Sequence, residues 1–367
     1  MPGPAQPGDL PELVRTKYSN LESVDWWRNL QIDGLVLYAW GHPKFRHVAR
    51  AVHEAGIRLV LNQDSGGWVS PRLGLRPWLG EQARLTGAGR VPGGRLHFIG
   101  QVAKGLSVGV LYTDRFRRRH FSYGDRIAAV SPVASERYQR LMECYGFRDS
   151  NRRVELLPHP VDPKFLYRGG KKERRLIAVG RWQDERQKRT RFLIEVLDRV
   201  LAKDTVLGVD LVGDPGANLI RWYSGLPLSL RGRIRLHGRV EPHVLVEMFE
   251  VSQVLYCSSA FESFHIASGE ALCCGNSVVS SRSVSLASFE WFTGEGDGSL
   301  ARHDQPGSHV AAILAELDRW QRGEHDASRI SARWTTRLHA PQVAARVLAM
   351  FEEERGQAGE EAGNVRE

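Results

Sequence analysis

The sequence contains little cysteine. Only four of its 367 residues are cysteines, at positions 144, 257, 273 and 274. They form no CxxC pair and no histidines follow at zinc-site intervals, which disfavours a metal finger and a disulfide framework. No stretch approaches the roughly 18 apolar residues of a membrane-spanning helix, and the first residues lack a signal peptide's apolar core. These absences predict a reduced, cytoplasmic protein.

Acidic residues are fewer than basic residues. The chain has 42 Asp and Glu against 51 Lys and Arg, a formal net charge of +9. This charge attracts anionic partners such as a nucleotide, a phosphorylated lipid, a membrane surface or nucleic acid. Because the basic residues are scattered and no recognition motif appears, we do not expect nucleic acid as the partner. The length predicts two domains at roughly 100–200 residues each.

Apolar runs of strand length alternate with helical periodicity in both halves of the chain. In the first half, a run at 35–39, a helical pattern over 45–55 and a run at 57–61 form a βαβ unit, which predicts a parallel sheet. Residues 65–95 are rich in Gly, Arg and Pro, and we expect a long loop there. The other predicted strands are 127–130, 154–157, 176–179, 208–213, 233–237, 253–257 and 277–281. The other predicted helices are 11–28, 96–121, 134–145, 190–203, 242–250, 266–274, 307–322 and 341–355.

This alternation predicts an α/β fold of two doubly wound, Rossmann-like domains that face a cleft. The predicted parts are an N-terminal arm (1–30), a first domain (31–168), a second domain (172–337) and a disordered tail (356–367).

The most informative segment follows the predicted strand 253–257. It crosses a turn and enters a short helix, whose free N–H groups and partial positive charge suit a phosphate. Glu262 and Glu270 flank the start of this helix, and their carboxylates can accept hydrogen bonds from the hydroxyls of a ribose or a sugar. An alternative remains open, in which Glu262 caps the helix and Glu270 is a solvated helix residue.

Two other clusters follow strands of the second half. Gly180 allows a ligand to approach the backbone, and Arg181 and Lys188 can hold two neighbouring phosphates. The alternative is a solvated basic face, since further Arg residues lie beside Lys188. After Gly238, the backbone of Arg239 and Val240 could lie along a base.

In this order, Gly180-Arg181, Lys188, Gly238-Arg239-Val240 and Glu262-x7-Glu270 resemble the nucleotide-binding half of the retaining GT-B glycosyltransferases of family four. The resemblance covers about 126–356. It includes Pro158-His159-Pro160-Val161-Asp162, which is similar to the family's Pro-Asn-Gly-Val-Asp element. It implies a GT-B fold in which helix 341–355 crosses back to the first domain.

The resemblance also implies roles for individual residues. The expected catalytic residues are Arg181 and Lys188, which would neutralise the diphosphate leaving group, and Glu262, which would meet the hydroxyls of the transferred sugar. The expected donor-binding residues are Gly180, Arg239, Val240, Ser263, Phe264, His265 and Glu270. His265 stands where the family commonly has Gly.

The implied activity is transfer of a hexose from a nucleoside diphosphate sugar to a glycan, lipid or small-molecule acceptor, with retention of configuration. Fixed cations and the lack of an Asp-x-Asp motif imply that no metal or other cofactor is needed. His42 and Asp64, just past predicted strands, are candidate acceptor-side residues, although a structural role suits each of them better. The basic run 115–119 leaves open a peripheral contact at the inner face of the membrane or a merely solvated helix end.

The beginning of the chain departs from the family pattern. Only a short segment precedes the run 35–39, where the family usually has further strands. The acceptor domain is therefore expected to be abbreviated, or its edge to be completed by another chain in a homo-oligomer. This departure motivates the alternative function, a catalytically silent protein that binds a nucleotide sugar or serves as a scaffold.

Overall fold

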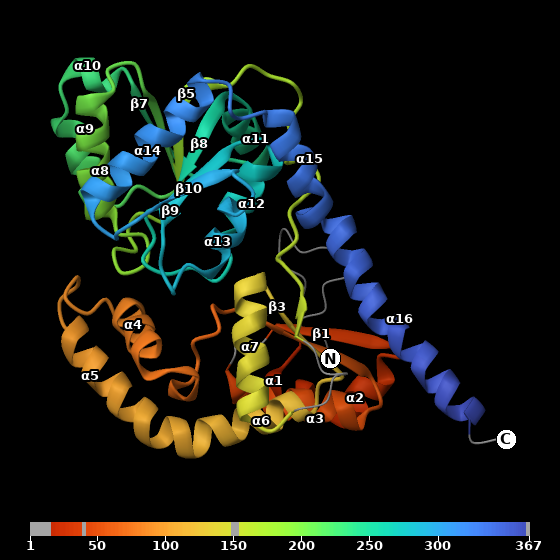
Figure 1. The fold of residues 1–367 in the computed structure, drawn as a ribbon. Coiled ribbons are helices and arrows are strands. Elements are labelled where there is room, and N and C mark those ends of the chain that lie inside the picture. The colour runs from red at the N-terminus through yellow and green to blue at the C-terminus, as the bar shows by residue number, and fades with distance from the viewer. Residues whose placement is uncertain (1–15, 39–41, 148–153, 365–367) are drawn as a thin grey trace.

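The computed structural model describes residues 16–38, 42–147 and 154–364, with 353–364 described for their backbone alone. It contains two parallel sheets, one in each half of the chain (Figure 1). Among the residues described, no helix combines the length and the apolar character that crossing a bilayer requires.

The second sheet has the strand order β10-β9-β8-β5-β6-β7. The chain moves outward from β5 to β7 and then returns to the other side of β5 for β8 to β10. This reversal creates a topological switch point between β5 and β8, and ligands of such sheets bind at the carboxyl ends of the strands there. The strands are β5 Glu173–Val179, β6 Gly208–Val212, β7 Ile234–Gly238, β8 Ser252–Tyr256, β9 Ser277–Ser281 and β10 Gly298–Ala301.

Helices cover both faces of this sheet, as its two winding directions require. They are α8 Thr190–Lys203, α9 Ala217–Gly225, α10 Leu228–Arg231, α11 Pro242–Val251, α12 Ile266–Cys273, α13 Ala287–Thr293, α14 Pro306–Gln321 and α15 Ala327–Leu338. The predicted strands and helices of this half agree closely with these bounds. The sequence reading did not identify α9, α10, α13, β10 or α15.

The first sheet is simpler, because its four parallel strands follow the chain order β1-β2-β3-β4. Right-handed crossovers that always advance in one direction place the connecting helices on one face. The first sheet is therefore singly wound, and the doubly wound arrangement expected for both domains holds only for the second. The strands are β1 Gly34–Tyr38, β2 Arg58–Gln63, β3 Arg126–Ala129 and β4 Val154–Leu156.

The segments that accompany the first sheet include one correction. The expected long loop at 65–95 is wrong, because α4 and the start of α5 lie there. The Gly and Pro residues that suggested a loop occupy helix ends: Pro77 lies in the first turn of α4, where its missing N–H costs nothing, and Gly87 ends the helix at φ +67°. The helices are α1 Tyr18–Leu21, α2 Val24–Asn29, α3 Arg46–Glu54, α4 Leu75–Thr86, α5 Gly94–Lys104, α6 Asp114–Ser122 and α7 Pro132–Cys144, with the 3-10 turns η1 Pro43–Phe45 and η2 Pro71–Leu73 and the π-helical segment η3 Gly105–Thr113.

The ends of the chain also differ from expectation. The described part of the predicted arm forms α1 and α2 instead of one helix, and Trp27 is buried in the core of the first domain, while residues 1–15 lie outside the described residues. At the other end, α16 Ala340–Asn364 continues through most of the predicted disordered tail, and residues 365–367 lie outside the described residues.

Helix α16 runs from the second domain across the first sheet (Figure 1). Val343 and Met350 of α16 are buried together with Val60, Ala128 and Leu157 of the first domain. The helix therefore covers the sheet face that the single winding direction leaves without connecting helices. This is the crossover that the resemblance implies.

Candidate active site

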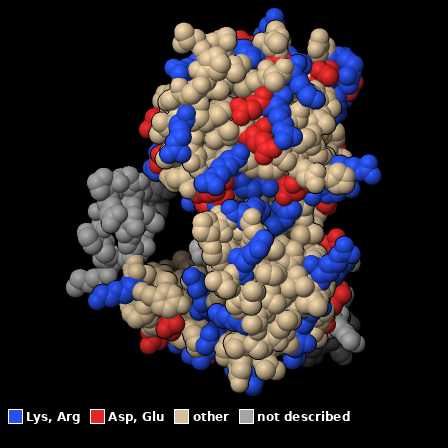
Figure 2. Space-filling model, turned by 90° about the vertical axis from the view of Figure 1, so that its left-hand side faces the viewer, with Lys and Arg blue, Asp and Glu red and all other residues tan. Residues whose placement is uncertain are grey.

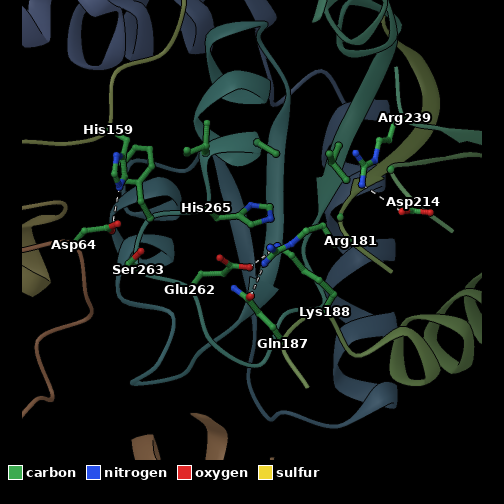
Figure 3. A pocket seen from close by; sticks show the side chains of 16 residues that line it. Asp64, His159, Arg181, Gln187, Lys188, Asp214, Arg239, Glu262, Ser263 and His265 are labelled. Carbon is green, nitrogen blue, oxygen red and sulfur yellow. Dashed lines mark hydrogen bonds and ion pairs between the residues drawn. The ribbon is translucent and has the colours of Figure 1, made fainter. Parts of the chain in front are cut away.

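A cavity of about 630 Å³ lies at the switch point of the second sheet, between the two domains (Figure 3). Its walls come from the loops after β5, β6 and β8, from the start of α12, and from the first domain. The lining residues are Asp64, His159, Val179, Gly180, Arg181, Gln187, Lys188, Gly213, Asp214, Arg239, Glu262, Ser263, Phe264, His265, Ile266 and Ala267.

The floor of the cavity depends on two glycines. Gly180 follows β5, and Gly213 follows β6 with a φ of +106°. A Cβ atom on Gly213 would lie 2.0 Å from the carbonyl oxygen of Gly180, so any larger residue would push the two loops apart. The loops after β5 and β6 thus approach each other closely at the carboxyl edge of the sheet.

A buried ion pair occupies the centre of the cavity wall (Figure 3). The Nζ atom of Lys188 lies 2.6 Å from Oε1 of Glu262, and both side chains are only 11% exposed. The hydroxyl of Ser259 donates a second hydrogen bond of 2.7 Å to the same oxygen. Burial raises the pKa of Glu262, but the charges of His265 and Lys188 and these two hydrogen bonds outweigh burial, and the net pKa is lowered. Glu262 is therefore held as a carboxylate.

The loop that carries Glu262 is held by two arginines. Arg189 is buried, adopts a left-handed φ of +53°, and donates to the carbonyls of Ser258 and Ser259. It also pairs with Asp304 at 2.8 Å, and Arg84 of α4 pairs with the same carboxylate at 2.8 Å. Although burial raises the pKa of Asp304, a hydrogen bond with His309 and the two arginines hold it far below its usual range.

His265 immediately precedes α12 and has a φ of +64°. Residues other than Gly rarely adopt this backbone conformation. A glycine would adopt this backbone without strain. The ring is buried, and its Nδ1 lies 2.7 Å from the hydroxyl of Ser268. The potential ligand atoms of Cys257, Glu262 and His265 lie within 4.8 Å of one another, so these side chains could hold a metal ion, although Lys188 already neutralises Glu262.

The first domain contributes a second contact between polar side chains to the cavity. Asp64, after β2, lies 3.0 Å from Nε2 of His159. The His159 ring stacks on Tyr38 of β1 with the centroids 5.8 Å apart, and Phe264 contacts it edge-on at 5.5 Å. His159 therefore links the edge of the first sheet to the loop that carries Glu262.

Most of the predicted site residues line this cavity. They are Asp64, Gly180, Arg181, Lys188, Arg239, Glu262, Ser263, Phe264 and His265. Arg239 points outward, is 81% exposed, and pairs with Asp214 at 3.4 Å. The residues that the sequence reading did not identify include Gln187 and Asp214, which face the cavity from loops, and His159, which only the Pro-His-Pro element could have indicated.

Three predicted residues do not line the cavity. Val240 packs against the hydrophobic core of the second domain. Glu270 lies on α12, and burial raises its pKa to about 7. His42 caps η1, where its Nδ1 accepts a hydrogen bond from the Lys44 amide.

Comparisons with known proteins bear on the fold of the chain and on its second domain. Residues 173–319 match the family described as glycosyl transferases group 1. A comparison with curated proteins gives no match to the sequence.

Several solved structures resemble the fold over most of the chain. Sucrose-phosphate synthase from Thermosynechococcus elongatus is 13% identical with a TM-score of 0.57, over 91% of this chain and 77% of that one. HepE from Anabaena, solved in complex with UDP, is 14% identical with a TM-score of 0.58, over 90% and 82% of the two chains. The pneumococcal O-GlcNAc transferase GtfA, in complex with UDP and GlcNAc, is 13% identical with a TM-score of 0.57, over 90% and 59%. The protein therefore has the GT-B fold, and residues 173–319 of its second domain are similar to the glycosyl transferases of group 1.

Proposed function

We propose that this protein is a retaining glycosyltransferase that moves a hexose from a nucleoside diphosphate to an acceptor without a metal ion. The observation that carries this proposal is the buried pair of Lys188 and Glu262 beside the switch-point cavity. The pair places a cation for a phosphate and a carboxylate for sugar hydroxyls side by side. The complexes of HepE with UDP and with UDP-glucose support a donor of this class.

The proposed chemistry follows from the charges around the cavity. Breaking the bond between the anomeric carbon and oxygen leaves negative charge on the diphosphate. Lys188, Arg181 and the amide groups at the start of α12 are placed to stabilise that charge, and one such contact is typically worth about 3–4 kcal/mol of the barrier. In a retaining transfer the acceptor attacks from the face that the leaving group departs, and a phosphate oxygen of the donor takes the acceptor proton.

The remaining residues of the proposed site act on the donor before the bond breaks. Glu262 binds hydroxyls of the transferred sugar, while the backbone from Ser263 to His265 approaches the sugar or the phosphate. Glu270 is proposed to bind the ribose. The acceptor remains a glycan, a lipid or a small molecule, and it would approach from the side of Asp64 and His159.

Calorimetric titration tests the diphosphate assignment. We expect Lys188→Ala and Arg181→Ala to weaken binding of UDP, GDP or ADP by about tenfold or more, because a charge-assisted hydrogen bond is lost. Binding of the matching nucleoside should change little. Lys203→Ala, an exposed lysine at the far end of α8, is the matched control and should bind like the wild type. Equal weakening of nucleotide and nucleoside would contradict the assignment.

A turnover assay distinguishes an active transferase from a catalytically silent protein that only binds the donor. We expect transfer or hydrolysis of the preferred donor in the presence of a chelator, with a product of retained anomeric configuration by NMR. Glu262→Gln should lower kcat more than donor affinity, because only contacts that strengthen in the transition state raise the rate. A wild-type protein that binds the donor tightly yet never turns it over would support the scaffold alternative instead.

A further inference from the structure

The outer side of the first domain carries an exposed apolar helix face. Helix α5 and the π-helical segment η3 follow each other without a break along the margin of the domain (Figure 1). Six large apolar side chains on this stretch are 47–77% exposed. They are Leu96, Ile99, Leu106, Val108, Leu111 and Tyr112, and we call them the apolar helix face.

The opposite side of the same stretch is anchored in the domain. Trp78 of α4 is 3% exposed, and a Cβ atom on Gly105 would lie 2.3 Å from its ring. Such close packing fixes η3 against α4. Leu96, Ile99 and Leu106 lie three and seven residues apart, a spacing that keeps side chains on one side of a helix. These three side chains of the apolar helix face are therefore held outward by the packing behind them.

The exposed charges of the segment 75–119, which carries the apolar helix face, are of one sign. Between residues 75 and 119 the only acidic residues are Glu81 and Asp114, and both are buried. Asp114 pairs with the buried Arg117 at 2.6 Å, so Arg117 does not belong to the surface of the basic run 115–119. The exposed cations of this stretch are Arg76, Arg95, Lys104, Arg115, Arg118 and Arg119. Figure 2 faces the side of α4 and α5, and the centre of its lower half is tan and blue.

We propose that the apolar helix face docks on the surface of an anionic lipid bilayer. Exposed aliphatic side chains flanked by Lys and Arg, with no exposed acid between them, are the features of a helix that lies in the membrane interface. A second copy of the chain is a poorer partner, because pairing two such faces would bring Arg95 and Lys104 of each copy against like charges. The docking surface does not depend on the transferase activity.

Vesicle flotation with the full chain tests this proposal. We expect the wild type to float with vesicles of phosphatidylcholine and phosphatidylglycerol in equal parts, and weakly with phosphatidylcholine alone. The triple variant L96E/I99E/L106E should lose at least about tenfold in binding, because it removes apolar contact and adds negative charge. The matched control V206E/I220E/L228E changes three exposed apolar residues of the second domain and should float like the wild type.

Two results would overturn the proposal. One is equal flotation of the wild type and the L96E/I99E/L106E variant. The other is a wild type that sediments as an oligomer and becomes monomeric in that variant without floating with anionic vesicles, since the face would then join copies of the chain. Unchanged circular dichroism and nucleotide binding of the variant show that it folds, so a loss of flotation can be assigned to the surface.

Discussion

Two carboxylates eight residues apart have pKa values that are shifted in opposite directions. Glu262 is ionised because Lys188, His265 and Ser259 outweigh the effect of its burial. For Glu270 burial prevails over the charges of His265 and Lys164, and its pKa rises to about 7. Glu262 is therefore ready to accept hydrogen bonds at any physiological pH, whereas Glu270 changes charge close to neutrality.

The raised pKa of Glu270 predicts a pH dependence of stability. A folded-state pKa of about 7 against an ordinary 4.5 means that the folded protein holds this proton more tightly than the unfolded chain does. The contribution to the free energy of unfolding, at most about 3 kcal/mol, is complete below the unfolded pKa and is lost as the pH rises through the folded pKa.

Melting temperatures measured from about pH 5 to pH 8 test this dependence. Glu270→Gln should reduce the loss of stability with rising pH, because the amide has no proton to release. A glutamine in place of Glu247, which is exposed on α11, should leave the wild-type profile unchanged. Identical profiles for the wild type and Glu270→Gln would show that Glu270 titrates normally.

The sequence identifies those residues of the site that belong to a motif within one stretch of the chain. Arg181, Lys188, Glu262 and His265 follow strand ends at a fixed spacing, which a linear pattern records. Such a pattern does not identify the supporting residues that come together in space from distant elements. Asp304 pairs with Arg84 from α4 and with Arg189 from the loop before α8. The sequence offered Arg189 only as one of the arginines beside Lys188, for which a solvated basic face was the alternative.

At the scale of the element, the structure gives α16 a place in the core of the first domain. Val343 is 4% exposed against the first sheet, while Leu348 on the same helix is 61% exposed. We therefore expect Val343→Asp to lower the free energy of unfolding of the first domain by about 3 kcal/mol or more, because an unpaired charge would be buried.

Leu348→Asp is the control, and it should stay within about 0.5 kcal/mol of the wild type. Limited proteolysis would locate the destabilised part of Val343→Asp at residues 31–168, and nucleotide binding by the second domain should persist. Equal stability of the two variants would mean that α16 is not part of the first domain's core in solution.

The sequence analysis did not predict α13 and α15, for two different reasons. Most of α13 is buried, with Phe289 and Phe292 fully inside, so it has no polar face that would reveal a helical period. Helix α15 did carry a readable signal. Asp326 caps it, and Ile330, Trp334 and Leu338 recur every four residues on its buried side. The sequence pattern therefore could not have revealed α13, whereas it could have revealed α15.

At the scale of the whole molecule, α4 connects the two domains. Arg84 of α4 donates to Asp304 and to the carbonyl of Ala260 in the second domain. Both charged side chains are about one-fifth exposed, so the pair is partly shielded from solvent. Opening the cleft would have to separate these partners.

Arg84→Ala should therefore loosen the contact between the domains without removing the nucleotide site. We expect a larger radius of gyration by small-angle X-ray scattering. The KM for the acceptor should rise by about tenfold, a change that corresponds to roughly 1.4 kcal/mol of binding free energy. The Kd for the nucleotide should stay near the wild-type value, because Arg189 still holds Asp304. Arg76→Ala on the exposed side of α4 is the control, and a matching change in that variant would contradict the prediction.

The sequence predicts two α/β domains and a shortened first one, but not how the first sheet is wound. Strand order is a property of pairing between distant segments, and the pattern of β1 to β4 is the same for either direction of winding. The single direction follows only from which strands pair: β1 with β2, β2 with β3 and β3 with β4.

The position of α16 also bears on how the protein is made on the ribosome. Domains usually fold from the N-terminus as they emerge. Here the face formed by Val60 and Ala128 is covered by Val343 and Met350, which lie more than 200 residues later in the chain. At translation rates of about 5–20 residues per second, the first sheet waits roughly 10–45 s for this cover. The second domain, whose sheet is complete by β10, can finish folding before the first, and a chaperone that shields exposed strands would act on the first domain during this interval.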